Sequence, residues 1–156
     1  MVLAGNFLSS RLPLRASSAV AAIVVVDADR YLMQLRDDIP SIWYPGHWGL
    51  FGGAVEAGED EVAALRRELW EELELEVATA QLFVRFDFDL TPMGLTRYFR
   101  AFYEVPISGA AYRRLVLHEG VEMRALSGDD ALSLPRLSPY DSFALFMHCH
   151  RRRIVP

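Results

Sequence analysis

The sequence contains no lysine, and all 16 of its basic residues are arginine. The absence of lysine excludes mechanisms that need a lysine Schiff base or the lysine of a P-loop. Codon bias in the source genome is our preferred explanation for it. Arginine still offers a planar, fork-shaped guanidinium group that binds phosphate well.

Cysteine is almost absent too, because Cys149 is the only one. A single cysteine excludes an internal disulfide framework and any metal site built from several cysteines, and it fits a reducing compartment. Met1–Leu8 lacks the basic start of a signal peptide, and the longest apolar run, Ala19–Val26, is too short to span a bilayer. We therefore expect a cytoplasmic protein with no membrane partner.

Positive charge is in deficit, since the formal net charge at pH 7 is −5. Such a chain has no general attraction to nucleic acid, so no nucleic-acid partner is expected. The run Arg151–Arg153 is too short to change this, and we interpret it as a solvated tail.

A length of 156 residues and a hydrophobic content of 52% predict one globular domain over residues 1–156, in which residues 1–17 form an arm or an edge strand. Apolar runs between turn residues predict strands at 19–26, 31–35, 77–86, 96–105 and 122–126. Helices are expected from Asp60 to about Leu75 and from Ser138, as the N-cap, to His150, with a short helical turn at 129–132. This order predicts an α/β fold of the α+β type, with a mixed sheet between helices.

Three glutamates, Glu68, Glu71 and Glu72, fall within one turn of the first expected helix. At about 100° per residue, Glu72 and Glu68 lie roughly 60° and 100° to one side of Leu69, which belongs to the apolar stripe. Their carboxylates are therefore expected at the rim of the core. Either they form a solvated flank paired with neighbouring arginines, or a divalent cation binds among them, because such cations prefer oxygen ligands.

The wider pattern resembles the signature of the Nudix hydrolase family. That signature is glycine, five residues, glutamate, seven residues, Arg-Glu, an aliphatic, any residue, Glu-Glu, any residue, glycine and an aliphatic. Its positions correspond here to Gly53, Glu59, Arg67-Glu68-Leu69, Glu71-Glu72 and Leu75. Agreement at the Gly, Glu and Arg positions has a chance probability on the order of 10⁻⁷ to 10⁻⁸ per start at background residue frequencies. One position departs, since Glu74 replaces the glycine that ends the family's helix, and we expect a prolonged helix or a different exit.

The resemblance covers about residues 18–148 and is strongest at 47–75. It implies an α/β/α sandwich with a mixed sheet, in which the signature forms a loop–helix–loop catalytic motif. The implied reaction is hydrolysis of a diphosphate linkage in a nucleoside diphosphate joined to another group, with Mg²⁺ or Mn²⁺ as cofactor. A homodimer is a further family expectation.

The resemblance also implies a role for each signature residue. Glu68 and Glu72 are implied as the core metal ligands, with the Gly53 carbonyl as an extra ligand. Glu71 is implied to share a second ion or to orient the attacking water. These ligands would let cations mediate the approach of an anionic diphosphate to an acidic protein.

The resemblance implies two further roles, a pair that holds the loop against the helix and a general base. Arg67 and Glu59 match family positions that pair and hold the loop against the helix. The general base is implied to be Glu68 or Glu119, although Glu119 is equally well explained as a solvated loop acid. Glu122 and Glu56 are weaker alternatives.

Substrate contacts are expected outside the signature. Trp43 and Tyr44 are candidates to stack on a base or to pack over the core. Arg36, Arg97 and Arg100 are candidates to contact phosphate or sugar, and although nothing in the sequence selects among them, Arg36 is our prediction for the substrate contact. Nucleoside triphosphates, nucleotide sugars and ADP-ribose all remain open as small-molecule substrates. The alternative function is a non-catalytic nucleotide sensor on the same fold, which the intact carboxylate cluster disfavours. The position of Cys149 argues against an isopentenyl diphosphate isomerase, and the lack of a basic stripe argues against RNA decapping.

Overall fold

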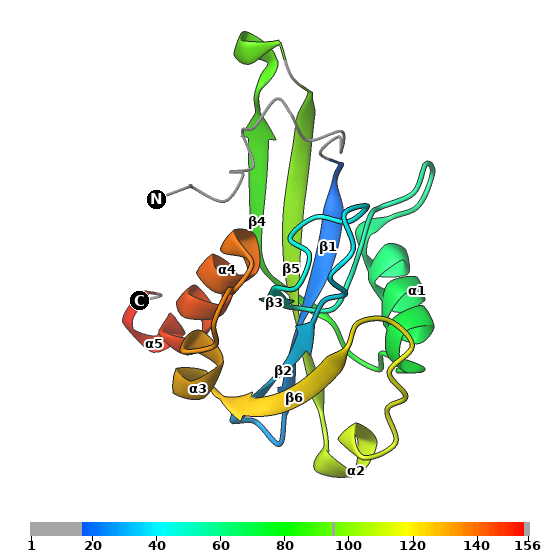
Figure 1. Ribbon diagram of the computed structural model, residues 1–156, viewed down its shortest axis with the longest axis vertical. Helices are drawn as coiled ribbons and strands as arrows, with labels where there is room; N and C mark the ends of the chain where they lie inside the picture. Colours follow the sequence, from blue (N-terminus) through cyan, green and yellow to red (C-terminus); the bar gives the residue numbers. More distant parts are fainter. Residues whose placement is uncertain (1–16, 95, 155–156) are drawn as a thin grey trace.

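The computed structural model describes residues 17–94 and 96–154, in which the strands form one mixed sheet with helices on both faces (Figure 1). The predicted α/β/α sandwich is therefore confirmed. The expected N-terminal arm lies outside the described residues, apart from Ser17. None of the helices in the described ranges has the length and apolar character needed to cross a membrane.

The sheet is organised around one strand with a parallel neighbour. β1 (Ala19–Val26) pairs in parallel with β5 (Arg97–Ile107) and forms a short antiparallel hairpin with β2 (Arg30–Leu35). β5 continues to β4 (Gln81–Asp89) at one edge, and β2 pairs along its length with β6 (Glu122–Ser127). Antiparallel and parallel pairs thus coexist in the sheet, as predicted.

The strands β1 and β2 diverge after their hairpin, and the chain from 48 to 54 fills the space between them. β3 (Trp48–Gly49) pairs with β2, and Phe51 and Ala54 form bridges to β1. The Val20 N–H donates to the Gly53 carbonyl at 2.9 Å. This double attachment fixes the backbone of the Gly52–Gly53 turn, which leads into the first long helix.

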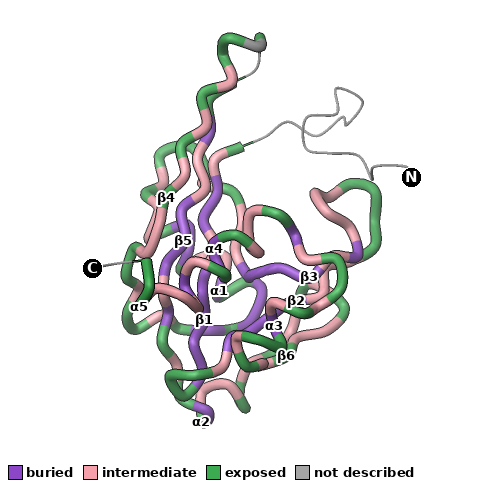
Figure 2. Tube along the Cα trace, turned by 90° about the vertical axis from the view of Figure 1, so that its left-hand side faces the viewer, coloured by how far each residue is buried: buried purple, intermediate pink, exposed green. Residues whose placement is uncertain are grey.

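The core lies on both faces of β1. Even-numbered residues such as Val20 and Val24 pack toward α1 (Glu61–Leu73), whereas Ile23 and Val25 pack toward the layer of α3 (Gly128–Leu132) and α4 (Pro139–Cys149). The buried segments accordingly gather along β1 and β5 (Figure 2). Burial on both faces explains why β1 is a continuous apolar run rather than an alternating one.

The shorter elements correct several predicted boundaries. β4 begins at Gln81 rather than at 77, because Val77 and Ala80 pack on the α1 side of the core instead of joining the sheet. The β4–β5 hairpin projects beyond the other strands and carries the turn η1 (Thr91–Met93) at its tip (Figure 1). A short helix, α2 (Gly109–Tyr112), follows β5 in the chain.

The ends of α1 show why this segment is helical. Asp60 caps the N-terminus, since its Oδ1 accepts the Ala63 N–H at 2.8 Å. At the other end Glu74 adopts the left-handed conformation (φ 54°), and its N–H donates to the Trp70 carbonyl at 2.9 Å. The expected prolongation of the helix is therefore wrong, because glutamate adopts here the conformation that usually favours glycine.

The C-terminal helices differ from expectation in two details. Pro139 opens α4 as predicted, but the Ser138 hydroxyl donates to Asp141 Oδ2 at 2.6 Å and does not cap the backbone. The run expected as a solvated tail is exposed at Arg152 and Arg153, but it is helical and belongs to α5 (Arg151–Ile154). It is anchored because Arg151 donates through Nη1 to the His148 carbonyl at 2.9 Å.

His148 joins three elements beneath the sheet and is fully buried, as a packing residue. Its Nε2 lies 2.5 Å from Glu104 Oε2 on β5, and its Nδ1 lies 3.0 Å from the Tyr31 hydroxyl on β2. Arg151 also directs Nη1 at the same Nδ1, at 3.3 Å. Two donors on Nδ1 indicate a neutral ring protonated on Nε2. Burial accordingly lowers the pKa of His148 below its usual 6.5, against the opposing effect of Glu104.

We predict that His148 makes the protein acid-sensitive. Because the folded-state pKa is lowered, the unfolded chain binds more protons, and the contribution of His148 is complete above pH 6.5 and is lost as pH falls below it. In His148→Gln this part of the pH dependence should vanish. Urea unfolding of both proteins between pH 5 and pH 8 measures the difference, and parallel curves would contradict the prediction.

Candidate functional site

The carboxylate of Glu72 lies inside the protein, at the junction of α1 and the Gly52–Gly53 turn. Glu72 is only 4% exposed, and its Oε2 accepts the Gly52 N–H at 2.8 Å. Burial raises the pKa of Glu72 to about 8, and the nearby carboxylates of Glu68 and Glu119 add to this effect. The ionised form of this side chain therefore needs a positive partner.

Glu68 lies one turn earlier on α1 and packs against Gly53. A Cβ atom at Gly53 would overlap the Glu68 carboxylate, so only glycine leaves this space open. Burial raises the pKa of Glu68, while Arg67 opposes the shift and Glu71 and Glu119 strengthen it. The Gly53 carbonyl already accepts one backbone hydrogen bond, which leaves its second lone pair for another partner.

Arg67 ties the preceding loop to the helix. Its Nε and Nη2 bind both oxygens of Glu59 at 3.0 Å, and Nη2 also donates to the Ala54 carbonyl at 2.9 Å. Its Nη1 binds Glu68 Oε1 at 2.8 Å. The structure thus shows the pairing of Arg67 with Glu59 that the resemblance implied, and the same guanidinium orients Glu68.

The other two glutamates approach the site from different directions. Glu71 is 54% exposed and lies 3.4 Å from Arg67 Nη1, on the outer side of Glu68. Glu119 comes from the loop before β6, and its charge reaches both Glu68 and Glu72. Its carbonyl accepts a hydrogen bond from the buried Gln34 amide at 3.0 Å.

These residues suit a hard divalent cation by their chemistry. Oxygen donors converge on one turn, and the open space at Gly53 adjoins them. In residues 17–94 and 96–154 no three acidic, histidine or cysteine side chains already form a complete metal site. Arg67 explains this, because it draws Glu68 and Glu71 toward itself. The ligand assignments to Gly53, Glu68, Glu71 and Glu72 stay predictions.

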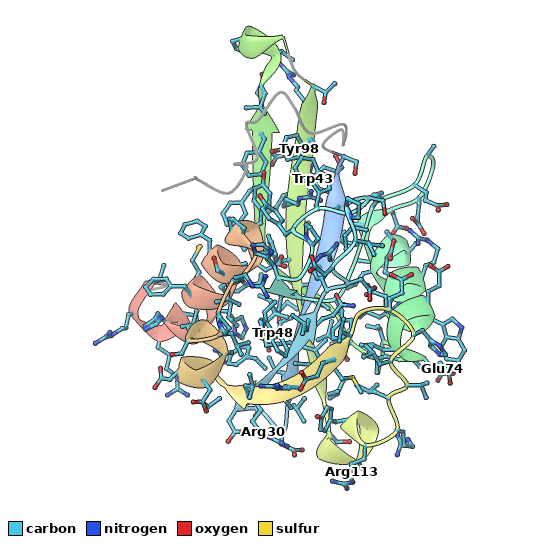
Figure 3. The ribbon with its side chains drawn as sticks, in the orientation of Figure 1. Arg30, Trp43, Trp48, Glu74, Tyr98 and Arg113 are labelled. Atoms are coloured by element: carbon cyan, nitrogen blue, oxygen red, sulfur yellow. The ribbon has the colours of Figure 1, made fainter. Side chains whose placement is uncertain are left out.

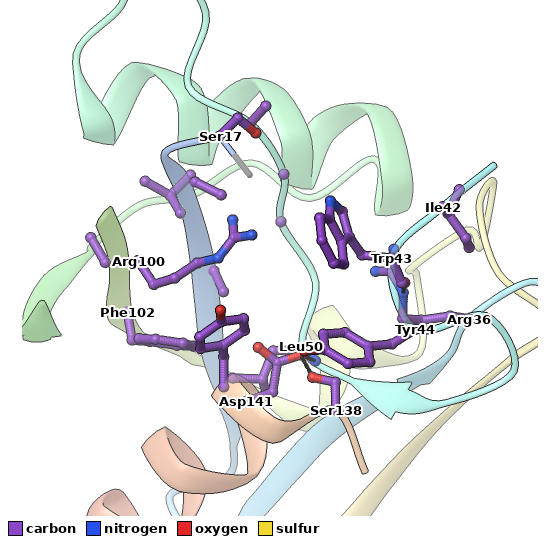
Figure 4. A pocket seen from close by; sticks show the side chains of 18 of the residues that line it. Ser17, Arg36, Ile42, Trp43, Tyr44, Leu50, Arg100, Phe102, Ser138 and Asp141 are labelled. Atoms are coloured by element: carbon purple, nitrogen blue, oxygen red, sulfur yellow. Dashed lines mark hydrogen bonds between the residues drawn. The ribbon is translucent and has the colours of Figure 1, made fainter. Parts of the chain in front are cut away.

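A cavity of about 330 Å³ opens beside the Gly52–Gly53 turn. Arg36, Trp43 and Tyr44 all line it, so the structure places the three predicted substrate contacts together. Trp43 and Arg100 stand on opposite sides of this cavity, with Tyr44 and Asp141 below them (Figure 4). The Tyr44 hydroxyl is buried without a hydrogen-bond partner in the described part of the chain.

Asp141 was not identified from the sequence as a site residue. Its Oδ2 accepts the Leu50 N–H at 3.0 Å and the Ser138 hydroxyl, and burial raises its pKa. The signal available was the spacing of Ser138 and Asp141, which we interpreted only as the start of a helix. Arg100, one of the three arginines considered as phosphate or sugar contacts, lines the cavity together with Arg36. Gln34 carried no sequence signal that distinguishes it from other glutamines.

Other acidic residues lie outside the site. Glu122, one of the weaker candidate bases, forms an ion pair with Arg124 on β6, so its carboxylate already has a partner. Asp129 and Asp130 occupy the first turn of α3, as expected for helix-start residues. Glu56 accepts the Glu59 N–H through its carbonyl in the turn before α1.

Comparison with known proteins gives a consistent result. A family model described as NUDIX domain matches residues 16–131. A Mycobacterium tuberculosis protein named as a candidate 8-oxo-dGTP diphosphatase is 53% identical over 51 residues, which are 33% of this chain and 36% of that protein. Nucleoside triphosphatase NudI of Escherichia coli is 40% identical over 60 residues, which are 38% of this chain and 41% of NudI.

These matches span well under half of either relative. A longer match comes from structure, since the crystal structure of a MutT protein from Methanosarcina mazei superposes with a TM-score of 0.70. That superposition covers 93% of this chain and 99% of the other at 21% identity, which shows a shared fold.

The two glycines of the turn predict different consequences of substitution. Gly52 has φ +136°, and a Cβ there would overlap the Val20 carbonyl, so Gly52→Ala should lower the free energy of unfolding by about 3 kcal/mol or more. At Gly53 a Cβ meets only the movable end of Glu68, so Gly53→Ala should cost about 1 kcal/mol or less. Urea unfolding compares the variants, and equal losses would contradict this account.

Glu72 predicts a pH dependence of the opposite sign to that of His148. Because its folded-state pKa of about 8 lies above the ordinary 4.5, the folded state holds more protons, and stability of the metal-free protein falls as pH rises between these values. Glu72→Gln should lose this dependence while keeping the Gly52 hydrogen bond. Unfolding is compared with and without Mg²⁺, which should restore the wild type at pH 8 and leave the variant unchanged.

Proposed function

The chain belongs to the Nudix hydrolase family, and from that premise we propose that it hydrolyses nucleoside triphosphates with Mg²⁺ or Mn²⁺ as cofactor. In this reaction water attacks one phosphorus, and the bond from that phosphorus to a bridging oxygen breaks. A mononucleotide and diphosphate leave, and the proton of the water passes to a carboxylate. A bound divalent cation would supply Lewis-acid stabilisation of the charge that develops on the phosphate oxygens.

The observation that carries this proposal is the buried Glu72 carboxylate beside Glu68. Burial raises the pKa of both Glu68 and Glu72, and the neighbouring charge of Glu119 repels both. Arg67 contacts Glu68 and Glu71, whereas Glu72 makes no contact with Arg67 within the described residues. A protein that only sensed nucleotides would gain nothing from this repulsion. Cation binding removes it, so the cluster supports an enzyme more than a metal-free sensor.

Glu119 is our proposed general base. The carboxylate of Glu68 is bound to Arg67, whereas that of Glu119 makes no hydrogen bond or ion pair within the described residues. Glu119 is exposed, so water reaches it. A base must be free to accept a proton in the transition state, and Glu119 meets this requirement better than Glu68.

The cavity beside the turn supports a nucleotide as the substrate. Trp43 offers a flat face for a base, and the unpaired Tyr44 hydroxyl and the Asp141 carboxyl offer polar contacts to its edge. Arg36 lines the cavity, and its charge lowers the pKa of both Glu72 and Asp141, so this guanidinium acts on both the carboxylate cluster and the cavity. We propose that Arg36 binds the phosphate chain there. A triphosphate agrees with the names of the two sequence relatives.

The test is turnover of nucleoside triphosphates, ADP-ribose and nucleotide sugars with Mg²⁺ or Mn²⁺, followed by chromatography of the mononucleotide. We expect metal-dependent release of diphosphate from a nucleoside triphosphate. Glu72→Gln should lower kcat by about 10²-fold or more, because the charge that holds the cation is lost. Glu119→Gln should lower kcat by about 10² to 10⁴-fold through loss of the base.

Glu76→Gln is the matched control, since Glu76 is exposed and lies just beyond α1. This variant should keep the wild-type rate. Trp43→Ala should raise KM more than it lowers kcat if the cavity binds the base. Nucleotide binding without metal and without turnover would instead support the sensor.

A further inference from the structure

The C-terminal end of α1 holds the loop that carries Glu119. The Val116 N–H donates to the Leu73 carbonyl at 3.1 Å, and the His118 N–H donates to the Glu72 carbonyl at 2.9 Å. A side-chain contact accompanies them, because His118 Nε2 lies 2.8 Å from Glu74 Oε1. Three contacts thus connect the end of the helix to the residues immediately before Glu119.

The helix exit makes two of these contacts possible. The last carbonyls of a helix have no partner within it. Here the left-handed turn at Glu74 lets the N–H groups of Glu74 and Leu75 bind earlier carbonyls, at 2.9 and 3.1 Å. The carbonyls of Glu72 and Leu73 are then available to accept hydrogen bonds from the loop. A glycine at 74 would form the same exit, but it would have no side chain to reach His118.

The other side of the loop is fixed by the end of β2. The Gln34 amide donates to the Glu119 carbonyl at 3.0 Å, and the Val121 N–H donates to the Leu35 carbonyl at 2.8 Å. The Gly120 N–H also donates to Asp37 Oδ2 at 3.1 Å. The backbone of Glu119 is therefore bracketed by β2 and α1, while its carboxylate stays free.

We propose that Glu74 and His118 are positioning residues that hold Glu119 toward the Glu68–Glu72 pair. Glu74 lies at the end of α1, where the chain from α2 to β6 passes it (Figure 3). The chain tolerates a non-glycine residue at φ 54° there and gains the contact with His118 in return. This inference rests on the proposed function, in which Glu119 accepts the proton from water.

Position matters for Glu119 because a base acts only within hydrogen-bond reach of the attacking water. The Glu74–His118 contact is half-exposed, so its contribution to global stability is small. We expect the contact to affect the catalytic rate more than it affects global stability, because Glu119 follows His118 directly in the chain. A role in positioning therefore predicts an effect on kcat, whereas a surface ion pair predicts none.

Glu74→Gly is the sharpest variant, because it keeps the helix exit and removes only the side chain. We expect kcat to fall about fivefold to tenfold with KM within twofold of the wild type. Glu74→Gln, which keeps an oxygen acceptor for His118, should retain most of the rate. Glu76→Gly, two residues further along, is the matched control and should change neither constant.

The decisive measurement repeats Glu74→Gly in the Glu119→Gln background. If Glu74 acts through Glu119, it has no further effect on kcat once the base is removed. An equal fall in kcat in both backgrounds would overturn the proposal, as would an unchanged kcat in the single variant.

A second measurement separates this proposal from the proposed function. If the wild type hydrolyses none of the substrates, the proposed function fails, and amide hydrogen exchange still tests the contact. Glu74→Gly should then speed exchange at Val116 and His118 at least fivefold relative to Glu76→Gly. Unchanged exchange at these two amides would overturn the role of Glu74 in holding the loop.

Discussion

A carboxylate buried at the rim of the core is the constraint around which the site is built. Glu72 belongs to a helix whose leucines pack on β1, so its position follows from that packing and not from any attraction to its neighbours. Burial raises the pKa of its carboxylate, and one backbone hydrogen bond from Gly52 offsets only part of this. A bound cation must offset the remaining cost of burying the ionised carboxylate, or a proton must neutralise it. This requirement connects the fold to the chemistry of the site.

The sheet topology provides the space that this carboxylate needs. The divergence of β1 and β2 admits the chain from 48 to 54, and Gly52 and Gly53 within it bring backbone close to Glu68 and Glu72. The same segment turns its other side to Asp141, which accepts the Leu50 N–H. One short stretch of backbone therefore borders both the carboxylate cluster and the cavity. Their adjacency is what the proposed function requires, since one nucleotide would have to reach both.

Arginine side chains organise the groups of the site in a way that lysine side chains could not. The guanidinium of Arg67 contacts three carboxylates and a carbonyl at once, and so it sets the relation between the loop and the helix. Arg36 spans from the Trp43 carbonyl toward the cluster. These two residues give the acidic site its positive neighbours, and within the described ranges neither Glu72 nor Glu119 forms an ion pair.

The sequence by itself determined α1, the strands around it and the set of signature residues. These depend on local periodicity, on the Asp60 cap and on fixed spacing, which are properties of short segments. It did not determine that Asp141 and Arg100 meet Tyr44, because those contacts join residues brought together by sheet pairing and by the docking of α4. It also misjudged the helix exit at Glu74, where a glutamate adopts the left-handed conformation that usually favours glycine. Local pattern identified the signature residues, and only tertiary packing decided what surrounds them.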